Sequence, residues 1–199
     1  GWFGFNAGSA LEASASGVNA FVVTHISSAA AGLAWALLDM WKHGKATMLG
    51  VITGAVAGLV AITPASGSVN AMGAIGVGVG SSLVAFWAVT WLKPKLGYDD
   101  SLDVFGVHGM AGIWGSLAAG LWATSMVPGN DTNGLLYGNA PQLLIQLKAV
   151  IYTIVWSGVA SWLLLKLIDV TVGLRATDHE ERVGLDVIDH SETAYTVLD

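Results

Sequence analysis

Residues 101–113 read SLDVFGVHGMAGI and place a single histidine, His108, within a run of small and apolar residues. This run belongs to an apolar stretch that is long enough to cross a membrane. An ionisable side chain in a bilayer is energetically unfavourable, so it usually faces protein or a water-filled path and usually has a functional role. The sequence therefore predicts a membrane-spanning helix in which His108 is the first candidate for function.

The composition of the chain is that of an integral membrane protein. Hydrophobic residues make up 54% of its 199 residues and charged residues only 11%, against about 25% charged in soluble domains. The chain has no cysteine, which excludes disulfides and thiolate metal sites. It also has no phosphate-binding loop, nucleophile elbow or zinc-protease motif. We therefore expect neither an enzyme nor a cofactor, a metal site or a nucleic-acid partner.

Five apolar stretches are each long enough to span about 30 Å of hydrocarbon as a helix. They are residues 17–41, 46–62, 70–92, 104–127 and 141–169. Residues 1–10 are interpreted as the end of a further helix, and the chain as the C-terminal part of a larger protein. The sequence thus predicts an all-α polytopic membrane protein with a transmembrane domain over residues 1–169.

Basic residues predict how these spans are oriented. They concentrate in two loops and the C-terminal tail, at Lys42, Lys45, Lys93, Lys95, Arg175 and Arg182, whereas the alternate loops contain no Lys or Arg. By the positive-inside rule, the basic loops and the C-terminus face the cytoplasm. Lys148, early in the last span, is the exception. Residues 170–199 are polar and acidic, and we expect a cytoplasmic tail that is either disordered or, because it contains several apolar residues, a small docked segment.

Each candidate side chain has a structural and a functional interpretation. His108 is either a core histidine that hydrogen-bonds a carbonyl or hydroxyl, or a pore-lining group that exchanges hydrogen bonds or relays a proton. His25 lies near Thr24, Ser27 and Ser28, which favours a structural role in hydrogen bonding between helices. The aromatic residues of the segment 2–9 either bind a cation through their rings or form an interfacial belt.

Five stretches in the same order resemble the Amt/Mep/Rh ammonium transporters. They are GWFGFNAGS (1–9), AFVVT with SAAAGLAW (20–35), GAVAGLVAITPASG (54–67), DVFGVHGMAGIWG (103–115) and IVWSGV with DVTVGLR (154–175). The tail segment HEERVGLDVIDHSETAY (179–195) is similar to the bacterial and archaeal Amt branch rather than the Rh branch. The resemblance implies an eleven-helix fold of two inverted repeats plus a long last helix, assembled as a homotrimer. This chain would run from the sixth helix onward and hold the second repeat and the last helix.

The resemblance also implies roles for individual residues. His108 matches the second histidine of a twin-histidine pore, and Ser9 matches the serine of an outer site that recruits ammonium. Phe5 matches a gating phenylalanine, and the pore-wall positions are Trp2, Val56 and Val104. The first histidine and the partner phenylalanine would belong to an N-terminal half of the transporter, which is therefore an expected partner.

The implied function is transport of ammonium or ammonia, with methylammonium as an analogue, across the plasma (inner) membrane for nitrogen uptake. The tail would be regulatory and would act with a PII-class signalling protein. Its candidate residues are Arg175, Glu180, Glu181, Arg182 and Asp186. An ammonium sensor (transceptor) and a purely structural membrane subunit are the alternatives.

Overall fold

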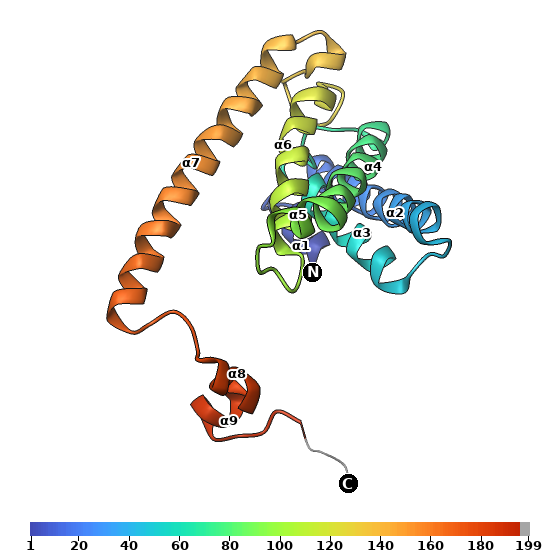
Figure 1. Cartoon of the computed structure of the whole chain (residues 1–199). Helices are drawn as coiled ribbons and strands as arrows, with labels where there is room; N and C mark the ends of the chain where they lie inside the picture. Colours follow the sequence, from blue (N-terminus) through green and yellow to red (C-terminus); the bar gives the residue numbers. More distant parts are fainter. Residues whose placement is uncertain (196–199) are drawn as a thin grey trace. The chain divides into compact units, whose positions relative to one another are not determined.

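The computed structural model describes residues 1–195, in which every regular element is helical (Figure 1). Contacts divide the chain into two compact units, Gly1–Tyr152 and the residues from Thr153 onward, and each is described by itself. The elements are α1 (Trp2–Gly8), α2 (Ala15–His43), α3 (Met48–Ile62), α4 (Ala71–Trp87), the π-helix η1 (Ala88–Leu92), α5 (Lys93–Leu96), the π-helix η2 (Phe105–Met110), α6 (Ala111–Trp122), the 3-10 helix η3 (Leu135–Tyr137), α7 (Ala140–Thr171), α8 (Asp178–Val183) and α9 (Leu185–His190).

Three helical stretches are long and apolar enough to cross a membrane. They are Ala15–His43, Ala71–Leu96 and Ala140–Thr171, the second of which joins α4, η1 and α5 end to end. Met48–Ile62 is a shorter apolar helix. The predicted all-helical membrane fold is therefore confirmed.

Short polar side chains set where these helices begin. Ser14 caps α2, Thr47 caps α3 and Asn70 caps α4, each by accepting a hydrogen bond from the amide of a glycine three residues on. Asp39, which is 5% exposed, accepts bonds from the amide and hydroxyl of Thr47 at 3.2 and 2.7 Å. Thr47 thus bonds to Asp39 of α2 and also caps α3, so it fixes the connection between the two helices.

The core of the first unit depends on close approach of helix backbones. A Cβ atom on Gly58 of α3 would lie 2.6 Å from the Ala31 side chain and from the Ser27 carbonyl of α2. A Cβ on Gly115 of α6 would overlap the carbonyl of Ala61. Ser27 uses the same contact to donate a hydrogen bond to the Gly58 carbonyl at 2.9 Å. Small residues thus place α3 between α2 and α6, as expected for helices packed in a membrane.

The fourth predicted span, 104–127, ends earlier as a helix than the sequence suggests. Helical structure runs through η2 and α6 and stops at Trp122, because Ala123 adopts an extended conformation with ψ 139°. The Ala123 carbonyl accepts a hydrogen bond from the Gly134 amide, and the Thr124 amide donates to the Ser68 carbonyl, both at 2.8 Å. Apolar residues continue beyond the helix because this loop packs into the fold, and Val127 is 3% exposed.

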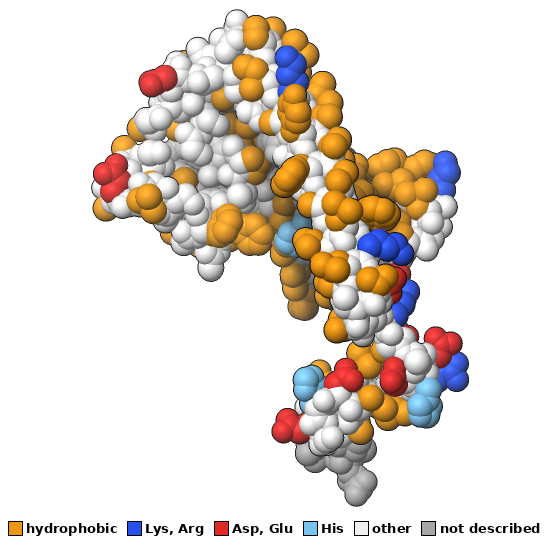
Figure 2. All heavy atoms as spheres, turned by 90° about the vertical axis from the view of Figure 1, so that its left-hand side faces the viewer, with side chains coloured by type: hydrophobic (Ala, Val, Ile, Leu, Met, Phe, Trp, Pro, Cys, Tyr) orange, Lys and Arg blue, Asp and Glu red, His pale blue; other side chains and the backbone are white. Residues whose placement is uncertain are grey.

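The second unit contains the rest of α7 and the C-terminal tail. Most side chains of α7 are exposed, and most of these are apolar, as expected of a helix whose surroundings are lipid or other protein (Figure 2). Charged side chains gather instead on the tail, where α8 and α9 form two short helices (Figure 2). The last four residues of the predicted 170–199 tail lie outside the described residues.

The close contact at Gly58 generates the first prediction. Gly58→Val should lower the thermal unfolding midpoint of the chain in detergent, because the added atoms overlap α2 and overpacking costs about 1–3 kcal/mol. Gly158→Val in α7 is the matched control, since a Cβ there meets no atom within 4 Å. Equal midpoints for the two variants would show that the α2–α3 approach does not limit stability.

Candidate functional site

His108 lies on the open side of the π-helical segment η2. Its neighbours Gly106 and Val107 are buried, whereas the His108 side chain is exposed. A π-helix accommodates one more residue per turn than an α-helix and is often found at functional sites. The imidazole ring faces the indole of Trp2, with 6.4 Å between ring centroids and 33° between ring planes.

The short helix α1 adds two aromatic rings to this histidine. Trp2 and Phe5 are three residues apart and share a face of α1, and their ring centroids are 6.0 Å apart. Phe5 is 63% exposed. A cavity of about 320 Å³ is lined by Gly1, Trp2 and Phe5. The fold thus brings Phe5, Trp2 and His108 together into one aromatic row, although about 100 residues separate its two ends.

Thr63 holds the centre of this row and was not identified as a site residue from the sequence. The Trp2 indole nitrogen Nε1 donates to the Thr63 hydroxyl at 2.8 Å, while that hydroxyl donates to the Leu59 carbonyl at 2.8 Å. In the sequence Thr63 stands out only as the residue before Pro64, where a helix is expected to end. That signal predicts a helix terminus but gives no indication of a partner 61 residues away.

The remaining predicted site residues are Val56, Val104 and Ser9. Val56 is partly buried on α3, which contacts η2. Val104 precedes η2 and is 51% exposed. Ser9 ends α1 and is exposed, and its hydroxyl donates to the Phe5 carbonyl at 2.6 Å. The Ser9 oxygen therefore keeps lone pairs with which it can accept a hydrogen bond from a cation such as ammonium.

His25 does not have the surroundings expected from the sequence. The neighbouring hydroxyls donate elsewhere: Thr24 to Ala20, Ser27 to Gly58 and Ser28 to Ala55. The His25 side chain is exposed on α2, with its ring centroid 6.0 Å from that of Phe3. It is therefore separate from the aromatic row.

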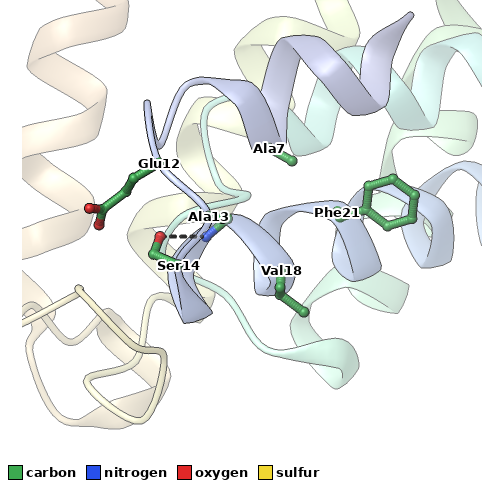
Figure 3. Close-up of a pocket in the computed structure, with 7 residues that line it drawn as sticks. Ala7, Glu12, Ala13, Ser14, Val18 and Phe21 are labelled. Atoms are coloured by element: carbon green, nitrogen blue, oxygen red, sulfur yellow. Dashed lines mark hydrogen bonds between the residues drawn. The ribbon is translucent and has the colours of Figure 1, made fainter.

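A second cavity, of about 310 Å³, lies where α1 meets α2 (Figure 3). Its lining includes Ala7, Val18 and Phe21, and the carboxylate of Glu12 is directed away from them. Glu12 and Ser14 also belong to its lining. Among residues 1–195, no cluster of three or more His, Asp or Glu side chains has the arrangement of a metal site.

The predicted regulatory residues lie in or beside α8 and α9. Thr177 and Glu180 form a capping box, in which each side chain accepts a hydrogen bond from the other residue's amide. The bond from the Thr177 amide holds the pKa of Glu180 below its usual value. The Asp186 carboxylate accepts from the Ala194 amide at 2.9 Å, which likewise lowers the pKa of Asp186. Glu181 and Arg182 belong to α8, and Arg175 lies in the segment between α7 and α8.

Comparison with known proteins identifies the family of the chain. A model described as the Ammonium Transporter Family matches residues 1–195. The chain belongs to the ammonium transporter family. An ammonium transporter from Aquifex aeolicus is 48% identical over 198 residues, and Amt1 from Archaeoglobus fulgidus is 47% identical over 198 residues. These alignments cover 99% and 98% of this chain but 46% and 49% of the relatives.

A solved structure has the same fold. The crystal structure of Saccharomyces cerevisiae Mep2 superposes with a TM-score of 0.84 at 31% identity, over 89% of this chain and 41% of that one. The chain thus spans about half the length of the ammonium transporters that it matches. The predicted family is confirmed, and with it a membrane transporter class rather than an enzyme.

The hydrogen bond between Trp2 and Thr63 generates the second prediction. In this ammonium transporter family member, Thr63→Val should destabilise the fold by about 1–3 kcal/mol, because the partly buried indole N–H loses its acceptor. Thr53→Val is the matched control, since Thr53 makes the same bond within α3, to Leu49, but is exposed. Unfolding midpoints in detergent measure the difference. An equal effect of the two variants would mean that the Trp2 bond adds no stability.

Proposed function

We propose that the chain forms one wall of a pathway that carries ammonium, as ammonia, across the membrane. The observation that carries the proposal is the row of Phe5, Trp2 and His108 on one open side of a member of the ammonium transporter family. The row combines two aromatic faces with one group that both donates and accepts hydrogen bonds. That combination suits a small solute that is a cation outside the membrane and a neutral amine inside it.

The chemistry of the row suggests the order of events. An arriving ammonium ion is attracted to the aromatic faces and donates a hydrogen bond to the Ser9 oxygen. A bare cation is strongly disfavoured in an apolar path, so ammonium transfers its proton to water near Phe5 before ammonia enters the path. Neutral ammonia then passes Trp2 and exchanges hydrogen bonds with His108, while Val56 and Val104 contribute apolar wall. Methylammonium follows the same steps as an analogue.

The pathway needs further helices, because the side chains of Phe5 and His108 are exposed in this chain. We propose that the N-terminal half of the transporter supplies the opposite wall, and that the complete subunit assembles as a homotrimer with one pore each. The basic loops support a cytoplasmic C-terminus, and we propose the plasma membrane as the location of the protein. Membrane lipid covers the remaining apolar surface.

An ammonium sensor and a purely structural membrane subunit are the two alternative functions. A sensor would use the same site with little flux, but the relatives from Aquifex aeolicus and Archaeoglobus fulgidus carry the name ammonium transporter, which favours flux. A purely structural subunit would seal His108 within the protein. The position of His108 beside Trp2, in one row with Phe5, favours the pathway.

The role of His108 generates the third prediction. His108→Ala should abolish selective ammonium transport in the assembled transporter, because it removes the hydrogen-bonding group from the row. Ammonium and potassium currents in liposomes measure flux and selectivity. His25→Ala is the matched histidine control and should retain ammonium transport, because His25 lies outside the row. Unchanged ammonium currents in His108→Ala, with no new potassium leak, would refute the pathway.

The tail generates the fourth prediction. We propose that α8 and α9 are regulatory and cooperate with a PII-class protein at the cytoplasmic face, through Arg175, Glu180, Glu181, Arg182 and Asp186. Deleting residues 173–199 should change transport activity or PII binding while leaving assembly intact, because the tail follows the last spanning helix. Size measurements by native mass spectrometry test assembly. A truncated protein that matches the parent in both activity and PII binding would contradict the regulatory role.

A further inference from the structure

The segment that carries His108 is fastened at its N-terminal end to a second π-helical segment. Lys93 directly follows η1, and Asp103 lies two residues before η2. The Lys93 ammonium donates to the Asp103 carboxylate at 2.7 Å and to the Asp100 carbonyl at 2.5 Å. The two side chains of this ion pair are only 28% and 29% exposed, so solvent screens it less than a surface pair.

The same turn also caps η2. The two carboxylate oxygens of Asp100 accept hydrogen bonds from the amides of Val104 and Phe105, both at 2.8 Å. Asp103 has φ 56°, in the left-handed region that Asp tolerates better than most residues. The ion pair with Lys93 therefore holds the turn at Asp103, the residue with positive φ.

Side contacts hold the two π segments together. A Cβ on Gly106 of η2 would lie 2.8 Å from the Val89 side chain of η1, so the segments approach closely only because residue 106 is glycine. Tyr98 packs the edge of its ring on Phe105, with centroids 5.6 Å apart and planes at 83°. The Gly106 contact thus brings η1 and η2 together, the Tyr98 contact packs the connecting segment on η2, and the ion pair links the end of η1 to the turn before η2.

The position of His108 depends on whether η2 keeps its π-helical form. A π-helical turn contains an extra residue compared with an α-helix. If η2 became α-helical and this residue moved into the preceding turn, the residues N-terminal to η2 would rotate relative to α6 by about 100°, the rotation per residue of an α-helix. His108 lies within η2, so such a change would turn its ring away from Trp2. An anchor at the N-terminal end of η2 opposes this rotation directly.

We propose that Lys93 and Asp103 are positioning residues, whose ion pair keeps η2 in its π-helical form and holds His108 against Trp2. Only the expected effect of this ion pair on transport rests on the proposed function. The structural part of the proposal concerns the orientation of residue 108 and can be tested separately.

The first test measures the orientation of residue 108 by thiol chemistry. The chain has no cysteine, so His108→Cys places a single thiol in the row. The rate at which a small water-soluble methanethiosulfonate modifies this thiol in the full chain in liposomes should change by about threefold to tenfold in Lys93→Met and in Asp103→Asn, because each variant removes the ion pair between residues 93 and 103. Asp103→Asn preserves the tolerance for positive φ.

Two controls accompany this test. Lys95→Met removes the same charge from the same helix, where Lys95 lies over the Trp91 ring, and should leave the rate unchanged. Lys93→Arg keeps the ion pair and should retain the parent rate. The double variant Lys93→Met/Asp103→Asn leaves no unpaired charge, so it can be examined even if a single variant fails to fold, and it should match the folded single variants. A parent rate in the double variant would overturn the proposal.

The second test measures methylammonium uptake with His108 in place. Lys93→Met should lower the maximal rate by about threefold to tenfold with little change in KM, because recruitment at Ser9 and Phe5 is not altered. Lys93→Arg should restore the rate. If the parent carries no methylammonium, the proposed function fails, while the thiol rates still decide whether the ion pair positions residue 108.

Discussion

Close backbone contact between helices is the constraint on which the rest of the structure depends. Lipid is as apolar as the side chains themselves, so helices in a membrane associate through packing and hydrogen bonds rather than through a hydrophobic drive. Gly58 and Gly115 let α3 approach α2 on one side and α6 on the other. Ser27 then donates across the first contact to the Gly58 carbonyl. The end of α3 is thereby brought to α1, where Thr63 meets Trp2.

Local features of the sequence predicted most of the fold. Apolar length predicted helices, and three helical stretches are long and apolar enough to cross a membrane. The caps Ser14, Thr47 and Asn70 were not predicted, although each is a residue type that favours a helix start. The end of α6 was less predictable, because apolar residues after Trp122 belong to a packed loop and hydrophobicity does not distinguish the two. The π-helical turns were not predicted, since their hydrogen-bond pattern has no periodicity that a sequence of small residues reveals.

The candidate site was predictable in part and for different reasons. His108 stands out because an ionisable residue is rare in an apolar stretch, and Trp2 and Phe5 follow from the family resemblance. Their proximity is a property of the fold, which pairs α1 with η2. Thr63 and Lys93 gave no such signal. From the sequence, one was expected at a helix end and the other in a basic loop, and each acquires its role from a partner in a different segment of the chain.

The row of aromatic side chains is thus held by bonds from outside it. Trp2 is fixed by Thr63 at the end of α3, and the segment with His108 is fixed through Asp103 by Lys93 at the end of η1. An apolar path offers few hydrogen bonds of its own, so the side chains that line it cannot orient one another by polar contacts. In the proposed pathway, bonds made behind the row hold the indole and the segment that carries His108, and they leave the imidazole free to exchange hydrogen bonds with ammonia. A histidine whose ring was hydrogen-bonded within the row would keep its position but could not exchange hydrogen bonds with ammonia. Holding the backbone segment rather than the ring therefore fixes the position of His108 and leaves its ring nitrogens available.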